Sequence, residues 1–113
     1  TTLFRSVWET VGSQDGYTLS YNPLTVSKAD GVSTATIKLE GSGPAMPTDP
    51  QGKPVAWYVE RMSINCAAKT YADLEMTYYN SAGAVTYSQQ NIHGMVPNSE
   101  SPIASAMMGK VCS

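Results

Sequence analysis

The two cysteines constrain the fold of this chain more than any other feature of its sequence. Cys66 ends the longest strand-like run, residues 55–66, and Cys112 lies beside the C-terminus. Their spacing is not the CxxC of a redox motif or a zinc site, and it favours one structural disulfide formed in an oxidising compartment. The alternative is a pair of buried free thiols in a cytosolic protein. We expect a Cys66–Cys112 disulfide that ties the C-terminal segment to a central strand.

Length and charge exclude several classes of protein. The chain has 113 residues, so we expect a single domain spanning residues 1–113. Its net charge is -2 and its lysines and arginines are scattered, whereas a nucleic-acid-binding protein needs a basic stripe that neutralises phosphates. No apolar run approaches the roughly 20 residues of a transmembrane helix. We therefore expect neither a nucleic-acid partner nor a transmembrane segment.

Alternating apolar and polar residues predict a series of β-strands. Residues 12–16 and 80–83 have turn composition, and the latter predict a hairpin loop. Pro23 is expected to end the second strand, since proline cannot donate the next ladder hydrogen bond, and a short extended piece follows at residues 24–27. The expected strands are a first one around Trp8 within residues 3–11, then residues 17–21, 32–40, 55–66, 70–79 and 84–90.

The run 55–66 changes phase along its length. One apolar set consists of Val55, Trp57 and Val59, and the other consists of Met62, Ile64 and Cys66. Because side chains alternate between the faces of a strand, a bulge near residues 60–61 would be needed to bring both sets to one core. We expect that bulge.

The tyrosines indicate a second surface. Each of the adjacent aromatic pairs at 57–58 and 78–79 must place one ring on either face of the sheet. If Trp57 and Tyr78 face the core, then Tyr58, Tyr71 and Tyr79 decorate the outer face. Tyrosine is enriched at protein interfaces. The outer face is therefore either an ordinary solvated surface or a surface for a partner or a homodimer.

The period changes to that of a helix near the C-terminus. Ser101 followed by Pro102 is typical of an N-cap and a first helical position. The following apolar residues form one stripe on a short helix and include Ile103, Ala104, Met107, Met108, Val111 and Cys112. Such a short helix is marginal alone, so we expect it to dock on the sheet.

The long irregular segment, residues 41–54, is rich in proline and glycine. It is either a variable surface loop or a binding loop, in which Met46 and Lys53 are the sizeable contact groups.

No residue pattern predicts catalysis, a cofactor or a metal. His93 is the only histidine, and no cluster has metal-ligand spacing. Asp73 and Glu75 would share one strand face, but an exposed polar face accounts for them without an acid–base role. We expect a protein that is not an enzyme and that has neither a cofactor nor a metal site.

The ordered set of motifs resembles the bacterial surface-adhesin E family. These motifs are Trp8, the tyrosine-rich second strand, the strand end 64–66, the hairpin 78–83, the segment 96–99 and the C-terminal cysteine. The resemblance implies an α+β, mainly β fold, with an antiparallel sheet of about six strands and a C-terminal helix fastened to one face by Cys66 and Cys112. It also implies that Trp8, Ile64 and Val111 are core residues, and that the protein is exported in a Gram-negative bacterium, in the periplasm or at the outer-membrane surface, with or without a lipid anchor.

Three functions are compatible with these expectations. The first is adhesion to host extracellular proteins through the outer face or the 41–54 loop. The second is a periplasmic structural or assembly module of the bacterial envelope. The third is binding of a small apolar ligand between helix and sheet, in a pocket lined by Met62, Met76, Met107 and Met108, although methionines there are also suited to filling a core.

Overall fold

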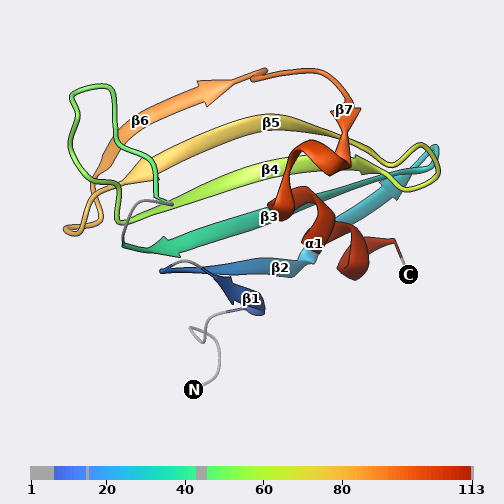
Figure 1. The fold of residues 1–113 in the computed structure, drawn as a ribbon, viewed down its shortest axis with the longest axis horizontal. Helices are drawn as coiled ribbons and strands as arrows, with labels where there is room; N and C mark the ends of the chain where they lie inside the picture. The colour runs from blue at the N-terminus through green and yellow to red at the C-terminus, as the bar shows by residue number, and fades with distance from the viewer. Residues whose placement is uncertain (1–6, 15, 43–45, 113) are drawn as a thin grey trace.

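A computed structural model describes residues 7–14, 16–42 and 46–112. Its framework is one antiparallel sheet in which six consecutive strands each pair with the next (Figure 1). These strands are β1 (Glu9–Gln14), β2 (Tyr17–Ala29), β3 (Val32–Gly41), β4 (Trp57–Asn65), β5 (Thr70–Tyr79) and β6 (Val85–Gln90). The two-residue strand β7 (Val96–Pro97) pairs with the start of β5, beyond the end of β6. The mainly β architecture with about six antiparallel strands is therefore confirmed.

Several strand boundaries differ from expectation; for example, β1 begins at Glu9, after Trp8, and β4 begins at Trp57 instead of residue 55. Strand β1 includes Gly12 and Ser13, which were expected in a turn, and the expected residues 3–6 lie outside the described part of the chain. Strand β2 continues through Pro23 to Ala29, so Pro23 does not end it. The pairing with β3 is instead interrupted between Asn22 and Ser27, where the Thr25 hydroxyl accepts a hydrogen bond from the Thr36 amide. An irregularity of this kind accommodates a proline without a missing ladder bond.

The C-terminal helix α1 (Pro102–Val111) begins as the sequence predicts. The Ser101 side chain accepts a hydrogen bond from the Ala104 amide at 3.1 Å, and Pro102 occupies the first turn. The short 3-10 helix η2 (Asn98–Glu100) precedes it. Ala104, Met107 and Val111 are buried, so the apolar stripe of α1 docks on the sheet and fills the space above it.

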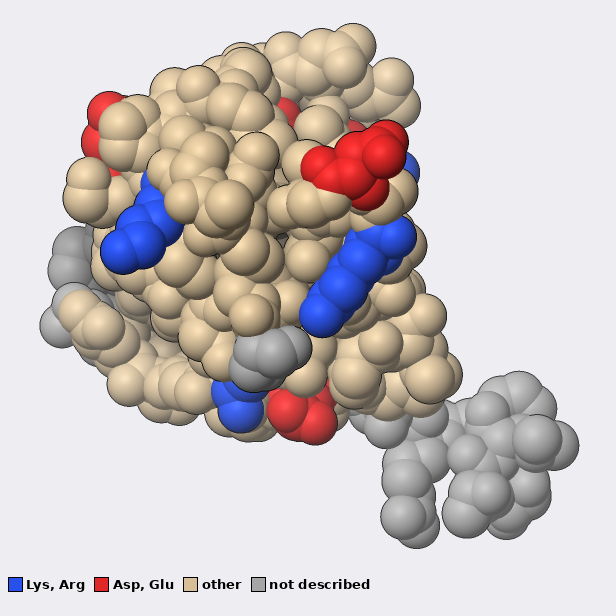
Figure 2. Space-filling model, turned by 90° about the vertical axis from the view of Figure 1, so that its right-hand side faces the viewer, with Lys and Arg blue, Asp and Glu red and all other residues tan. Residues whose placement is uncertain are grey.

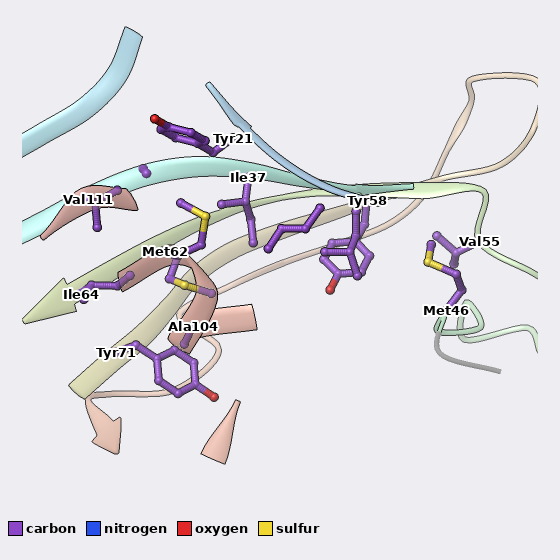
Figure 3. Close-up of a cluster of buried hydrophobic side chains, with 14 residues drawn as sticks. Tyr21, Ile37, Met46, Val55, Tyr58, Met62, Ile64, Tyr71, Ala104 and Val111 are labelled. Atoms are coloured by element: carbon purple, nitrogen blue, oxygen red, sulfur yellow. The ribbon is translucent and has the colours of Figure 1, made fainter. Parts of the chain in front are cut away.

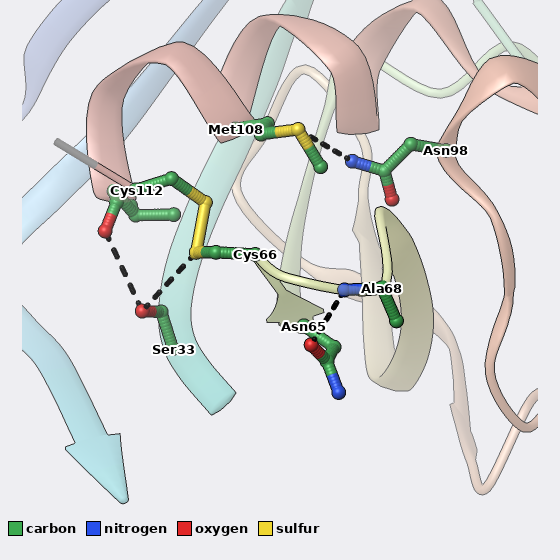
Figure 4. The surroundings of a disulfide bond; sticks show 8 residues. Ser33, Asn65, Cys66, Ala68, Asn98, Met108 and Cys112 are labelled. Carbon is green, nitrogen blue, oxygen red and sulfur yellow. Dashed lines mark hydrogen bonds between the residues drawn. A yellow bond between two sulfur atoms is a disulfide. The ribbon is translucent and has the colours of Figure 1, made fainter. Parts of the chain in front are cut away.

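The disulfide between Cys66 and Cys112 joins the end of β4 to the end of α1 (Figure 4). It links positions 46 residues apart in sequence, with their Cα atoms 5.6 Å apart. Ser33, a buried residue of β3, donates a hydrogen bond from its hydroxyl to the Val111 carbonyl at 3.4 Å. The covalent bond and this hydrogen bond both fix the last turn of α1 to the sheet, so the expected tether is confirmed.

The core lies between α1 and the sheet face that it covers, which we call the core face (Figure 3). Alternate residues of β3 point into it, and Ile37 and Leu39 are almost fully buried. Strand β4 contributes alternate residues in the same way. The buried cluster comprises Leu19, Tyr21, Ala35, Ile37, Leu39, Met46, Val55, Tyr58, Met62, Ile64, Tyr71, Ala104, Met107 and Val111.

The expected change of phase in β4 is wrong. Tyr58, Glu60, Met62 and Ile64 all lie on the core face, and no residue is inserted in β4. The irregularity is close to its predicted position but belongs to the partner strand, because Arg61 pairs with Glu75 whereas Met62 pairs with Asp73. Leu74 of β5 is the extra residue. The bulge therefore changes the phase of β5 instead of that of β4.

Candidate functional site

A cleft of about 690 Å³ lies at the end of the sheet where the loop before β4 meets the β5–β6 hairpin. These two segments lie together in Figure 1, at the end away from the C-terminus. Both residues that the sequence suggested as contact groups, Met46 and Lys53, line this loop–hairpin cleft. Its lining comprises Gly41, Ser42, Met46, Pro47, Thr48, Lys53, Pro54, Val55, Ala56, Asn80 and Ser81.

The loop wall of the cleft is held by a buried aspartate. The Asp49 side chain accepts hydrogen bonds from the backbone amides of Gln51 and Lys53, both at 2.9 Å. Thr48 forms an isolated β-bridge with Pro54. Met46 is 9% exposed and packs beside Val55 (Figure 3). The cleft therefore has a loop backbone held by hydrogen bonds, an apolar wall and an exposed lysine. These features suit it to bind an apolar side chain that carries or adjoins an acidic group.

The outer face carries a row of aromatic rings around one lysine, which we call the outer aromatic row. Trp57 and Tyr79 stack with ring centroids 5.3 Å apart. The Lys38 ammonium lies 5.8 Å from the ring centroids of both Trp8 and Trp57, and 3.6 Å from a carboxylate oxygen of Glu40. Tyr79 is thus on the outer face as expected, whereas Trp8 lies beside Lys38 instead of in the core. Ile64 and Val111 are core residues, as predicted.

Two other tyrosines are not on the outer face, and their expected placement is wrong. Tyr58 and Tyr71 are 7% and 8% exposed and belong to the core cluster, while Trp57 faces outward. Tyr58 packs against Tyr78, and Tyr71 lies edge-on to the ring of His93. The unbroken alternation of β4 places Tyr58 inward. The bulge in β5 places Tyr71 inward.

The methionines expected around a ligand pocket fill the core instead. Met62 and Met107 are 2% and 0% exposed, and Met76 and Met108 pack against the same cluster. None of the four lines the loop–hairpin cleft or the smaller cleft of about 110 Å³ between α1 and the β1–β2 hairpin.

A buried group of ionisable residues lies on the core face, and sequence reasoning missed it. Glu60 is 4% exposed and faces Asp73 on β5, and Asp73 in turn is bonded to His93 in the segment that follows β6. We call Glu60, Asp73 and His93 the acid–histidine cluster. The expected pair of carboxylates, Asp73 and Glu75, is split between the two faces by the bulge at Leu74.

The geometry of the cluster specifies where its protons lie. His93 Nδ1 is 2.7 Å from the Gly94 carbonyl oxygen, and Nε2 is 2.7 Å from Asp73 Oδ2. A carbonyl and a carboxylate only accept hydrogen bonds, so this arrangement favours a doubly protonated imidazolium. The Gly94 carbonyl raises the pKa of His93, Asp73 raises it further, and burial opposes both.

Glu60 is suited to hold a proton as well. Its Oε2 atom and Oδ1 of Asp73 are buried and lack any other hydrogen-bond partner among the described residues. Burial raises the pKa of Glu60 well above its ordinary value, and the neighbouring Asp73 raises it further. A protonated Glu60 donating to Asp73 satisfies both oxygens. Tyr58, Met62 and Ile64 stand an even number of residues from Glu60, and this spacing is the sequence signal that could have placed Glu60 inside.

In the described residues, the fold is an antiparallel sheet with the helix α1 bridged by a disulfide to one face. A family model described as surface-adhesin protein E matches residues 8–113, and the chain belongs to this family. Comparisons with curated proteins and with solved structures gave no match. The family implies a surface adhesin that is exported and binds another protein. Among the described residues, no helix is long and apolar enough to cross a membrane.

Charged residues are sparse on the surface. In Figure 2, a few lysine, arginine and acidic side chains, some of them next to one another with opposite charge, interrupt a face that is otherwise uncharged. This distribution agrees with a composition of 14% charged residues. Recognition by this face would therefore depend on shape and apolar contact more than on long-range electrostatic attraction.

Proposed function

We propose that this chain is an adhesin displayed at the outer-membrane surface, and that it binds a host extracellular protein through the loop–hairpin cleft. Membership of the surface-adhesin protein E family supports the general role. The cleft is the observation that supports the site, because it is concave, mainly apolar and lined by both Met46 and Lys53.

The physical basis of binding is an apolar anchor with a charged neighbour. A partner side chain inserted against Met46 and Val55 would lose its contact with water, which is the dominant source of affinity at small interfaces. Lys53 is exposed at the wall of the cleft and would pair with a carboxylate beside that anchor. The outer aromatic row would extend the contact area, because Trp57 and Tyr79 are the chain neighbours of Ala56 and Asn80, which line the cleft.

The competing function is that of an assembly module, which would bind a partner in the bacterial envelope. A binding experiment with both kinds of ligand distinguishes the two functions. The purified protein is measured by biolayer interferometry against immobilised host matrix proteins and against proteins of the bacterial envelope. Saturable binding to a matrix protein supports adhesion, whereas binding confined to envelope proteins contradicts it.

The site is tested with two lysine variants of equal charge change. Lys53→Glu alters the cleft, and Lys28→Glu alters an exposed lysine of β2. We expect Lys53→Glu to raise the Kd for the matrix protein by about tenfold, which corresponds to about 1.4 kcal/mol, while Lys28→Glu leaves the Kd unchanged. Equal effects of the two variants would reject the cleft as the binding site.

A further inference from the structure

We propose that the acid–histidine cluster is a pH-sensitive fastening that holds residues 91–95 against β5 in its protonated state and releases them in alkaline solution. The inference concerns a conformational device and does not depend on the proposed partner. It rests on the positions of three side chains that come from β4, β5 and the segment after β6.

Residues 91–95 are attached to β5 by few bonds. The Asn91 amide donates to the Leu74 carbonyl at 2.7 Å, and the His93 amide donates to the Asp73 carbonyl at 3.5 Å. The other attachments are a long hydrogen bond from the Thr70 hydroxyl to the Met95 sulfur at 3.7 Å and the His93 side chain, which bonds to Asp73 and makes an edge contact with Tyr71. Gly94 and Met95 are exposed. The histidine therefore carries a large share of the contact between this segment and the sheet.

Loss of one proton removes the match between His93 and its surroundings. A neutral imidazole has one N–H group, yet both ring nitrogens face acceptors. Deprotonation would leave either Gly94 or Asp73 without a donor and would turn a lone pair toward an oxygen. The charge-assisted bond to Asp73 would also be lost.

Loss of the Glu60 proton would also weaken the cluster. When Glu60 ionises, its carboxylate lies beside that of Asp73 on a buried part of the core face, where like charges repel strongly. Strand β4, which carries Glu60, and the segment that contains His93 are bonded to opposite edges of β5. Both deprotonations therefore weaken the same region of β5.

The other ionisable groups around the cluster do not oppose this weakening at high pH. Glu100 of η2 faces His93 and Tyr71, and it favours the imidazolium. On the sheet, Tyr58 and Tyr78 face Glu60, and Tyr17 of β2 faces Tyr58. Burial raises the pKa of Tyr58 and of Tyr78, so these phenols stay neutral over the range in which His93 titrates.

Hydrogen exchange tests the proposal on the unmodified protein. Protection factors of backbone amides, corrected for intrinsic exchange, are measured between pH 5.5 and pH 8.5. We expect protection of the Asn91 amide to fall at least tenfold over this range. The Ala56 amide, which donates to the Tyr79 carbonyl at 2.9 Å and lies away from the cluster, serves as the internal reference and should not change.

Two variants separate the contributions. In His93→Gln the side chain still donates to Asp73 but has no charge to lose, so the pH dependence at Asn91 should shrink to less than threefold. In Glu60→Gln the dependence should persist and follow the titration of His93 measured from its ring proton shifts. If Asn91 protection changes equally in the parent protein and in His93→Gln, or does not change in the parent, the proposal is overturned.

Discussion

Cys112, one residue past the end of α1, is bonded to Cys66, one residue past the end of β4, although 46 residues separate them in the chain. This bond closes a loop that contains β5, β6 and α1. It restricts the unfolded chain, and the loop-entropy relation gives a stabilisation of about 4 kcal/mol for a loop of this length. That amount is comparable to the net stability of a small protein.

The first prediction follows from this bond. Cys112→Ser, studied beside Cys66→Ser, should lower the free energy of unfolding by roughly 2–4 kcal/mol and release the last turn of α1 from the sheet. Thermal denaturation followed by circular dichroism measures the loss. Both variants should lose the same amount, because each removes the same bond. A melting temperature unchanged in either variant would contradict a stabilising role for the tether.

The second prediction concerns the packing of α1. Met107 is 0% exposed, whereas Met95, in the segment before β7, is 45% exposed. Met107→Ala should cost about 2–5 kcal/mol because it leaves a cavity between helix and sheet. Met95→Ala makes the same chemical change without a cavity and should stay within about 0.5 kcal/mol of the parent. Urea denaturation midpoints compare the two, and similar losses would show that α1 does not depend on Met107.

The third prediction is the cost of the helix cap. The Ser101 side chain accepts the Ala104 amide, so Ser101→Ala removes the partner of a helix N–H group. The expected loss is about 1 kcal/mol. Ser99→Ala, two residues earlier and exposed, is the matched control and should be neutral. Chemical denaturation of both variants checks the difference, which should disappear if another group caps the helix.

The fourth prediction is the sign of the pH dependence of stability. The pKa values of His93 and Glu60 are both raised in the folded state. The folded protein therefore binds more protons than the unfolded chain, and stability falls as pH rises. The contribution of Glu60 to the free energy of unfolding declines as pH rises above its ordinary pKa of 4.5. The contribution of His93 declines as pH rises above its ordinary pKa of 6.5. The free energy of unfolding should thus be higher at pH 5 than at pH 8.

Glu60→Gln isolates one part of this slope. The amide keeps the shape of the side chain and can donate to Asp73, but it does not ionise. The variant should be more stable than the parent at pH 8 and should approach the parent near pH 4. Urea titrations at several pH values measure the two slopes. If the stability of the variant fell with pH as steeply as that of the parent, groups other than Glu60 would cause the pH dependence.

The features that could be predicted from the sequence are those with a local signal or a covalent cause. Alternation located β3 and most of β5, because one face of each strand is buried. Ser101 before Pro102 located the start of α1, because the first amides of a helix need an acceptor. The two cysteines predicted the tether, since a chain with two has only one intramolecular pairing available.

Which tyrosines face the core depends on how β4 and β5 pair, and the sequence of one strand does not specify that pairing. The extra residue Leu74 shifts β5 against β4, and nothing in the residues around it distinguishes an insertion in one strand from an insertion in its partner. Placing the bulge in β4 therefore reversed the faces of Trp57 and Tyr58. It also kept Asp73 and Glu75 on one face.

The sequence alone determined the strand-rich fold, the bridge between Cys66 and Cys112 and the capped helix, because each depends on short-range periodicity or on a unique pair of residues. Only the tertiary structure decided that Glu60, Asp73 and His93 meet, since they come from three segments whose relative register is set by the bulge. The tertiary structure likewise brought Met46 and Lys53 to one cleft with the β5–β6 hairpin. Contacts between distant segments depend on strand register and on the path of the loops, and local composition determines neither.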